Sequence, residues 1–250
     1  MKNRQKTGSG GNSDESKLVR LNKYISNSGV CSRRDADTLI AKGEISVNGK
    51  TVTDLGTRIK PDALVKYRGK TINPEKKVYI LLNKPSGYVS STDDPHADRI
   101  VTDLIRKACD ERVYPVGRLD RDTTGVLLFT NDGELTKKLT HPSHNKKKVY
   151  HVFLNRPLAQ NDMLRLTEGV DIGEIVSADA AAYPDPDDKT QVGIEIHSGQ
   201  NRVVRRMFET LGYRVKKLDR VSFAGLTKKN LPRGKWRFLS RKEINILRRS

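Results

Sequence analysis

The chain has 250 residues, 35% of them hydrophobic, and carries 48 Lys and Arg against 30 Asp and Glu, a formal charge of +18. Its length and apolar content suffice for one or two domains with buried cores, and its charge favours a polyanionic partner such as RNA. It lacks the roughly 20-residue apolar run of a membrane-spanning helix and the apolar segment of a signal peptide, so we expect a cytoplasmic protein with no membrane partner.

The N-terminal residues 1–17 are mostly Gly, Ser, Asn and charged side chains. They offer almost nothing to bury, and we expect a disordered arm. Folded structure begins near residue 18, where Leu21 and Ile25 are spaced to share one face of a short helix that stops at Gly29.

A second helix follows, because Ser32 and Asp35 have the spacing of a capping box and Gly43 supplies a stop. Beyond it, Asn48 and Gly49 separate two short apolar segments and predict a hairpin turn. Two short basic helices and a hairpin make a small α/β module over residues 18–70.

A second domain is expected over residues 75–250. The continuous apolar run Val78–Leu82 is typical of a strand buried on both faces. Further strands are predicted at 126–130, 149–154, 192–196 and 214–218, and helices at 134–140, 158–167, 202–211 and 241–249. This mixture predicts an α+β fold with a mixed, largely antiparallel sheet.

A cluster of acidic and basic residues precedes the predicted strand 126–130. In it, Asp120 and Asp122 alternate with Arg118 and Arg121. Flanking cations stabilise an ionised carboxylate, which can act as a nucleophile or a base. The residues alone do not choose between the two acids, and a surface salt-bridge cluster has the same pattern.

A basic helix near residue 205 supplies the natural partner. Arg202 and Arg206 share one face of this helix, whereas Arg205 lies beside its apolar side. A cation close to the core requires a carboxylate, and Asp120 is a candidate.

Two resemblances sharpen these expectations. The segment "RLNKYISNSGVCSRRDADTLIAKGEISVNG" resembles the S4 RNA-binding domain over about residues 18–65. By that resemblance, five residues would face RNA: Arg20, Lys23, Ser32, Arg33 and Arg34.

Four ordered motifs resemble the RsuA/RluB/RluE/RluF family of ribosomal RNA pseudouridine synthases: "NKPSGYVSS", "GRLDRDTTGVLLFTNDGEL", "KKVYHVFL" and "GQNRVVRRMFETLGYRVKKLDRV". The resemblance implies that Asp120 is the catalytic acid and Asp122 an auxiliary residue. It also implies that Tyr150 lies against the target base, that Arg205 pairs with Asp120 and that Leu218 lies under the base.

The same resemblance places Arg118 and Thr123 in the base pocket and Arg202 and Arg206 on RNA. One departure is visible, because many relatives have Glu-Gly-Arg or Glu-Gly-Lys where this chain has residues 197–200, His-Ser-Gly-Gln. At this departure the motif itself assigns no RNA contact to His197, Gln200 or Arg202.

The implied reaction breaks the C1′–N1 bond of a uridine, turns the uracil and rejoins it through C5, which requires a flipped-out nucleotide. Asp120 would attack the ribose or start glycal formation as a base, and both routes stay open. The reaction needs no cofactor. His141 and His144 flank Pro142 without further ligands, which favours a surface turn over a metal site.

The expected substrate is ribosomal RNA, with large-subunit RNA favoured by the Arg-rich "NRVVRRMF", and the expected state is a monomer. A non-catalytic S4 protein of ribosome assembly is the alternative, although Asp120, Tyr150 and Arg205 are all present. An RNA methyltransferase would need a Gly-rich methyl-donor loop after a strand, and none is found.

Overall fold

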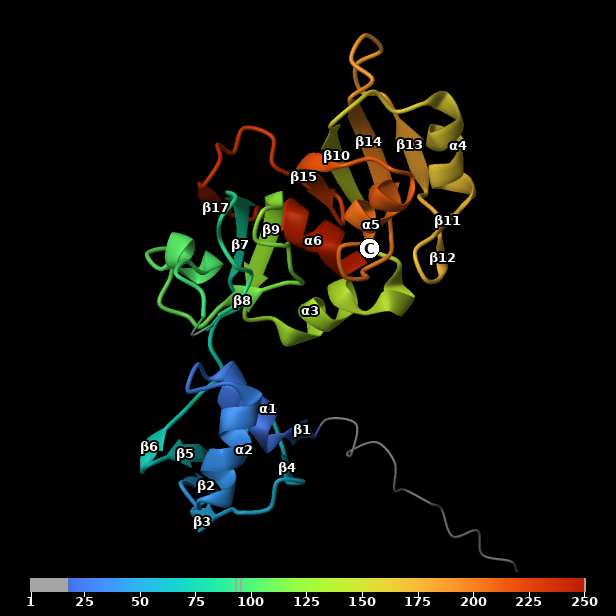
Figure 1. Ribbon diagram of the computed structural model, residues 1–250. Helices are drawn as coiled ribbons and strands as arrows, with labels where there is room; N and C mark the ends of the chain where they lie inside the picture. The colour runs from blue at the N-terminus through green and yellow to red at the C-terminus, as the bar shows by residue number, and fades with distance from the viewer. Residues whose placement is uncertain (1–17, 93, 95, 250) are drawn as a thin grey trace, which may run out of the picture. The chain divides into compact units, whose positions relative to one another are not determined.

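The computed structural model of the protein describes residues 18–92, 94 and 96–249 (Figure 1). The chain divides into two compact units, residues 1–76 and 77–250. The expected arm, residues 1–17, lies outside the described residues. Among the described helices, none combines the length and the apolar character needed to cross a bilayer.

The first unit packs two helices, α1 (Leu21–Asn27) and α2 (Arg33–Ala41), against small antiparallel sheets. Its four-stranded sheet has the order β3-β2-β5-β6, and β1 pairs with β4. The strands are β1 (Val19–Arg20), β2 (Ile45–Val47), β3 (Lys50–Thr51), β4 (Arg58–Ile59), β5 (Val65–Tyr67) and β6 (Lys70–Thr71).

Two local signals predicted from the sequence, a helix cap and a hairpin turn, are present in this unit. The Ser32 hydroxyl accepts a hydrogen bond from the Asp35 amide at 3.2 Å, and the Asp35 carboxylate accepts from the Ser32 amide at 3.3 Å, which completes the capping box. Asn48 and Gly49 both adopt positive φ, 49° and 82°, as a tight hairpin turn between β2 and β3 requires.

The second unit is built on a nine-stranded sheet. Its main order, β13-β14-β10-β15-β9-β7-β17, can be followed across Figure 1, with β16 added to β15 and β8 to β9. The strands are β7 (Tyr79–Lys84), β8 (Tyr114–Pro115), β9 (Thr124–Thr130), β10 (Lys148–Leu154), β13 (Ala180–Ala182), β14 (Gln191–Ile196), β15 (Val215–Phe223), β16 (Leu226–Thr227) and β17 (Trp236–Phe238). A separate hairpin joins β11 (Val170–Asp171) to β12 (Ile175–Val176).

All pairs in the sheet are antiparallel except β9 with β15, which confirms the mixed, largely antiparallel fold. The expected helices are present as α3 (Gly133–Thr140), α4 (Gln160–Glu168), α5 (Val203–Thr210) and α6 (Arg241–Arg249), together with short 3₁₀ turns at Val101–Ile105 and Pro142–His144. The predicted strand 214–218 is too short, because β15 continues to Phe223.

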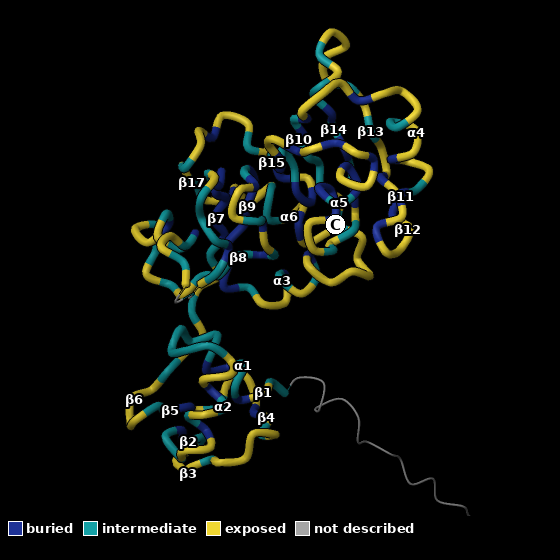
Figure 2. Tube along the Cα trace, in the orientation of Figure 1, coloured by how far each residue is buried: buried dark blue, intermediate teal, exposed yellow. Residues whose placement is uncertain are grey.

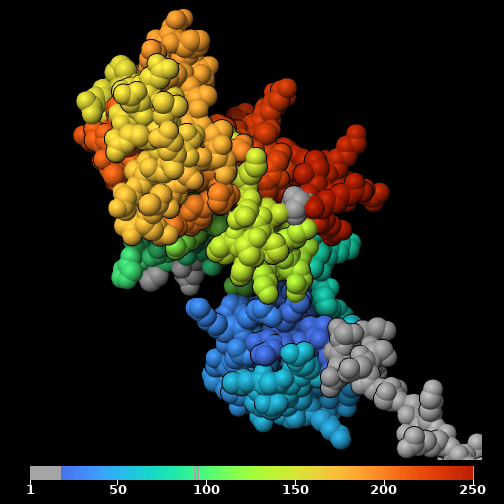
Figure 3. All heavy atoms as spheres, turned by 90° about the vertical axis from the view of Figure 1, so that its right-hand side faces the viewer, coloured from blue at the N-terminus to red at the C-terminus, as the bar shows by residue number. Residues whose placement is uncertain are grey.

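The sheet of the second unit buries both of its faces in the β7–β9 half, as the tube in Figure 2 shows. One face packs on α3 and α6 through residues such as Leu139 and Leu247, and the opposite face packs on the 3₁₀ turn through Val101 and Ile105. Figure 3 shows the segment that contains α3, in lime, beside the red C-terminal residues. The Lys138 ammonium donates to the Arg248 carbonyl there at 2.5 Å.

The two halves of the sheet meet where β9 and β15 run parallel. Only two residue pairs form this junction, Thr124 with Asp219 and Gly125 with Arg220. Gly125 has φ +110°, and a Cβ at this position would lie 2.1 Å from the Arg220 carbonyl oxygen. The position therefore requires glycine, and the loop that carries Asp120 enters the sheet at this point.

Candidate active site

A cavity of about 630 Å³ opens in the second unit beside the β9–β15 junction. Four segments form its walls: the loop 116–123 before β9, the start of β10, the loop 198–202 before α5, and β15. The candidate site residues that line it are Arg118, Asp120, Thr123, Tyr150, Arg202 and Leu218.

Asp120 lies in the wall of this cavity with its side chain 31% exposed. Its Oδ2 atom is 3.7 Å from Nη1 of Arg202 and 3.9 Å from Nε of Arg205. Both are ion-pair distances without a hydrogen bond. The carboxylate therefore faces two positive charges and keeps its oxygen atoms available to a substrate.

Arg205 approaches Asp120 from the protein side. The residue is 8% exposed, its Nη1 donates to the Val215 carbonyl at 3.2 Å, and its buried Nε has no hydrogen-bond partner. Burial and the nearby Arg202 lower the pKa of Arg205, whereas Asp120 opposes that shift. The predicted pairing of Arg205 with Asp120 agrees with this geometry.

Tyr150 and Leu218 meet in the same cavity from neighbouring strands. Tyr150 of β10 is half-buried, and Leu218 of β15 is almost fully buried. An aromatic ring and an apolar side chain in one cavity can hold a planar base between them. Thr123 lies buried in the cavity wall, and Arg118 is exposed at it.

Other predicted residues lie elsewhere. Asp122 is exposed and is not part of the cavity lining. Arg206 is also outside the lining, and its guanidinium donates to the Ile172 carbonyl of the β11–β12 hairpin. Sequence reasoning placed Arg206 beside Arg202 on one helix face, but Arg202 has φ +52° and precedes the helix, so the two side chains diverge.

The S4-like residues belong to the first unit. Arg20, Arg33 and Arg34 are exposed, as a role in RNA binding requires, and Lys23 is half-buried. Ser32 uses its hydroxyl in the capping box of α2, where it also donates to the Asp35 carboxylate at 2.7 Å.

Lys84 holds the loop of Asp120, and sequence reasoning missed it. It ends β7, is fully buried, and its ammonium donates to the carbonyls of Asp120, Arg121 and Thr123 at 3.1, 3.0 and 2.8 Å. Burial lowers its pKa to about 8. The available signal was a lysine at the end of a mostly apolar strand, where a buried charge needs polar partners such as backbone carbonyls.

Two other residues of "NKPSGYVSS" form hydrogen bonds with the backbone of the same loop. The Gly87 amide donates to the Arg121 carbonyl at 2.9 Å. The buried Ser90 hydroxyl donates to the Leu119 carbonyl at 2.8 Å and accepts from the Leu119 amide at 3.1 Å. This first motif therefore fixes the backbone on which Asp120 stands.

The departure at residues 197–200 has a distinct local structure. The His197 ring lies 2.7 Å from an oxygen of Asp179, and the Lys148 ammonium donates to the His197 carbonyl at 2.7 Å. Gln200 lines the cavity, and its buried side-chain oxygen has no hydrogen-bond partner. His197 thus anchors the loop, while Gln200 faces the cavity.

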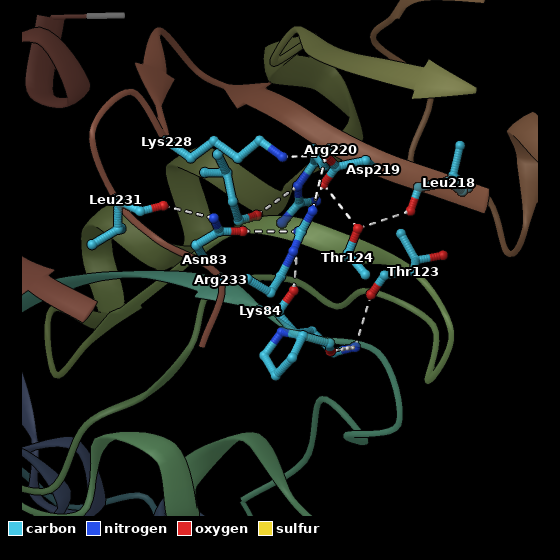
Figure 4. Close-up of polar contacts among 12 residues, drawn as sticks. Asn83, Lys84, Thr123, Thr124, Leu218, Asp219, Arg220, Lys228, Leu231 and Arg233 are labelled. Carbon is cyan, nitrogen blue, oxygen red and sulfur yellow. Dashed lines mark hydrogen bonds and ion pairs between the residues drawn. The ribbon is translucent and has the colours of Figure 1, made fainter. Parts of the chain in front are cut away.

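A partly buried ionic network braces the β9–β15 junction (Figure 4). The Asp219 carboxylate accepts hydrogen bonds from Thr124 at 2.9 Å and from Arg233 at 3.0 and 3.3 Å, and it pairs with Lys228. Burial opposes ionisation of Asp219, but the bonds from Arg233, Lys228 and Thr124 outweigh it and lower its pKa to about 2. Arg233 also donates to the Asn83 side chain at 2.9 Å, which ties β7 into the network.

No group of three potential metal ligands occurs within residues 18–92, 94 and 96–249. His141 bonds to the Ser143 hydroxyl at 2.7 Å inside an exposed turn, in agreement with the surface-turn interpretation.

Comparison with known proteins matches this arrangement to a family. A family model described as RNA pseudouridylate synthase matches residues 78–210, and a model of the S4 domain matches residues 19–65. The chain is 42% identical to "Ribosomal large subunit pseudouridine synthase B" of Bacillus subtilis, over 92% of this chain and 96% of that protein. It is 39% identical to "Dual-specificity RNA pseudouridine synthase RluF" of Escherichia coli, over 90% of this chain and 77% of that protein.

A solved structure described as "Crystal structure of pseudouridylate synthase" is similar with a TM-score of 0.64 and 29% identity, over 92% of this chain and 99% of that chain. Together with the sequence matches, this shared fold confirms the resemblance drawn from the four motifs. The protein belongs to the RNA pseudouridylate synthase family and is an RNA pseudouridine synthase with an N-terminal S4 domain.

Proposed function

We propose that the protein isomerises a uridine of ribosomal RNA to pseudouridine, with Asp120 acting on the ribose of a flipped-out nucleotide. One observation carries the assignment of the site: Asp120 is a partly exposed carboxylate in a cavity, within 4 Å of two guanidinium groups. Large-subunit RNA is the favoured substrate, in keeping with the name of the Bacillus subtilis relative.

The cavity suits an extruded uridine. Tyr150 offers a ring to the face of the uracil, and Leu218 offers an apolar contact from the adjacent strand. Extruding a base costs a few kcal/mol, and these contacts together with phosphate contacts offset that cost. The enzyme can then reach C1′, which is hidden in a stacked helix.

Asp120 has two chemically consistent roles. As a nucleophile its carboxylate bonds to C1′ while the C1′–N1 bond breaks, and the turned base then displaces it through C5. As a base it takes a proton from C2′ to form a glycal, and it later returns the proton. Both routes require an ionised carboxylate, which the neighbouring Arg205 and Arg202 favour.

The basic residues explain RNA binding. The chain carries an excess of 18 positive charges, and phosphate neutralisation releases counterions. Arg20, Arg33 and Arg34 present exposed cations on the S4 unit. We assign them to structured RNA beside the target nucleotide, together with Lys23, Ser32 and Arg202.

The reaction exchanges one glycosidic bond for another and transfers no electrons to an acceptor, so we infer that the enzyme works without a cofactor. We further infer that it acts as a monomer in the cytoplasm, where ribosomal RNA is made in bacteria. The non-catalytic alternative is disfavoured, because Asp120, Tyr150 and Arg205 are all present and placed around one cavity.

The test is tritium release from RNA labelled at C5 of uridine, using separate small- and large-subunit transcripts. We expect release by the native protein from the large-subunit transcript and none by Asp120→Asn, which keeps the shape of the side chain. Asp187→Asn, at an exposed acid outside the cavity lining, is the matched control and should retain activity. Equal release by Asp120→Asn and the native protein would refute the assignment.

A further inference from the structure

Three cations of the second unit bond mainly to backbone carbonyls at or near the cavity: Lys148 and Arg220 line it, and Lys84 holds the loop that carries Asp120. Lys84 donates only to backbone carbonyls, and so does Lys148, at 2.9 and 2.7 Å. Arg220 donates from Nε to the Val126 carbonyl at 2.9 Å, and its guanidinium lies 4.8 Å over the Phe223 ring. Within the described part of the chain, no acid forms an ion pair with any of these three.

Holding such cations inside a protein is costly. Burial lowers the pKa of both Lys84 and Lys148 to about 8, and the charge of Arg220 contributes to each shift. Arg220 itself is 3% exposed, and its buried Nη2 has no hydrogen-bond partner. Nearby acids offset part of this cost, because Asp120 and Asp122 favour the charged form of Lys84 and Asp179 favours that of Lys148.

Arg220 lies where the target base would be. In the register of β10 and β15, Tyr150 is directly opposite Arg220, and both line the cavity. Leu218 lies two residues earlier on the same face of β15 and also lines it. A side chain this deep is out of reach of the RNA phosphates, which stay on the exposed backbone of the flipped nucleotide.

The chemistry supplies negative charge at this place. When the C1′–N1 bond breaks, its electron pair stays with N1, and the charge spreads over the uracil oxygens O2 and O4. The charge is consumed when C5 bonds to C1′, after which the proton on C5 is lost. The released base is thus an anion for as long as it is detached from the sugar.

We propose that Arg220 provides the positive charge that stabilises the detached uracil anion. This inference rests on the proposed function and adds a residue to it. A fixed buried cation acts strongly on charge that appears only during the reaction, because the surroundings are poor in water and need no reorganisation. The bond to Val126 and the packing on Phe223 hold the guanidinium in place.

The first experiment separates charge from shape. Arg220→Gln keeps an amide donor without the charge, and Arg220→Lys keeps the charge. We expect Gln to slow single-turnover tritium release about 100-fold and Lys to slow it less than about tenfold, with RNA affinity by filter binding unchanged within about twofold. Lys217→Gln, an exposed position on the same strand, is the matched control and should be unaffected.

The second experiment changes the leaving group. The same transcript is made with 5-fluorouridine, whose ring withdraws electrons and gives a more stable anion, and consumption of the nucleoside at the target is followed by mass spectrometry. The loss caused by Arg220→Gln should then be at least about tenfold smaller than with uridine, because the base depends less on the cation.

Equal losses on both transcripts, or equal damage by Lys and Gln, would overturn the proposal, since a purely structural role predicts both. If Arg220→Gln does not fold by circular dichroism, the two-transcript comparison is made with Arg220→Lys, whose weaker contact should show the same trend, and equal losses would again overturn the proposal. Inactivity of the native protein on every transcript would instead count against the proposed function.

Discussion

The Nε atom of Arg205 lies 3.9 Å from Oδ2 of Asp120, although one residue belongs to α5 and the other to the loop before β9. Arg205 is buried, and its side chain donates a hydrogen bond to the Val215 carbonyl. The pair therefore connects the loop that carries Asp120 to the core of the other half of the sheet, and Arg205 shares the Asp120 carboxylate with Arg202.

Replacing Arg205 by Met should reduce the single-turnover rate about 100-fold, because Asp120 loses its buried counterion. Arg205→Lys should recover part of the rate. Filter binding should give an RNA affinity within about twofold of the native value. Arg206→Met removes a guanidinium from the same helix that faces the β11–β12 hairpin, and a similar rate loss in that control would contradict the assignment.

Lys84→Met should disorganise the loop that carries Asp120, since three of its carbonyls lose their donor. We expect at least a 100-fold loss of single-turnover rate with little loss of RNA binding. Limited proteolysis should cut this loop faster in the variant than in the native protein, which measures its loss of order. A fully active variant would show that the loop holds its shape without the clamp.

The same lysine predicts a pH dependence. Its pKa is lowered from 10.5 to about 8, so the ammonium form is present below about pH 8 and loses a proton above it. Activity should fall as the pH rises past about 8, because the clamp loses a donor. The free energy of unfolding should change in the opposite direction. Between pH 8 and 10.5 the unfolded chain binds a proton at Lys84 that the folded chain has lost, so the contribution of Lys84 to stability increases as the pH rises through this window. Parallel rate and denaturation measurements against pH separate the two.

Asp219 should make the second unit sensitive to acid. Its pKa in the fold is about 2 against an ordinary 3.8, so its ion pairs stabilise the fold by about 2 kcal/mol above pH 4, and this stability is lost as the pH falls toward 2. Asp219→Asn should cost about 3 kcal/mol at pH 7, because Arg233 and Lys228 lose their counterion. Denaturant unfolding at several pH values measures both effects. If the variant loses as much stability between pH 4 and pH 2 as the native protein does, that loss belongs to groups other than Asp219.

Gly125→Ala should destabilise the second unit by at least about 3 kcal/mol, through strain at φ +110° and through the clash with the Arg220 backbone. Gly199→Ala is the control, because a Cβ there meets no atom within 4 Å. The thermal midpoints of the two variants provide the comparison. Equal midpoints would mean that the junction between β9 and β15 can widen at little cost.

Arg33→Gln and Arg34→Gln should weaken RNA binding and lower the dependence of affinity on salt by about one unit of slope per contact. At saturating RNA the turnover of the double variant should be unchanged, since neither residue belongs to the catalytic unit. Lys50→Gln, exposed on the hairpin of the same unit, is the control. Native affinity and a native salt dependence in the double variant would show that Arg33 and Arg34 do not contact the RNA.

Much of this architecture was predictable because its signals are local. The capping box at Ser32, the turn at Asn48 and Gly49 and the extent of α6 depend on neighbouring residues. The apolar run of β7 was recognisable because a strand buried on both faces has no polar alternation. Short strands such as β8, β13 and β17 were missed, because two or three residues carry no readable period.

By itself, the sequence determined the order of the domains, the main helices and strands, and, through motif resemblance, the candidates Asp120, Tyr150, Arg205 and Leu218. Only the tertiary structure decided that Arg202 as well as Arg205 faces Asp120 and that Arg206 turns away. It also decided that Lys84 lies buried beneath the loop of Asp120 and that Arg220 lies buried in the cavity wall. The physical reason is that burial and charge pairing depend on residues brought together from distant strands. Here they meet across a parallel junction of two residue pairs, which the spacing of neighbouring residues in the sequence does not reveal.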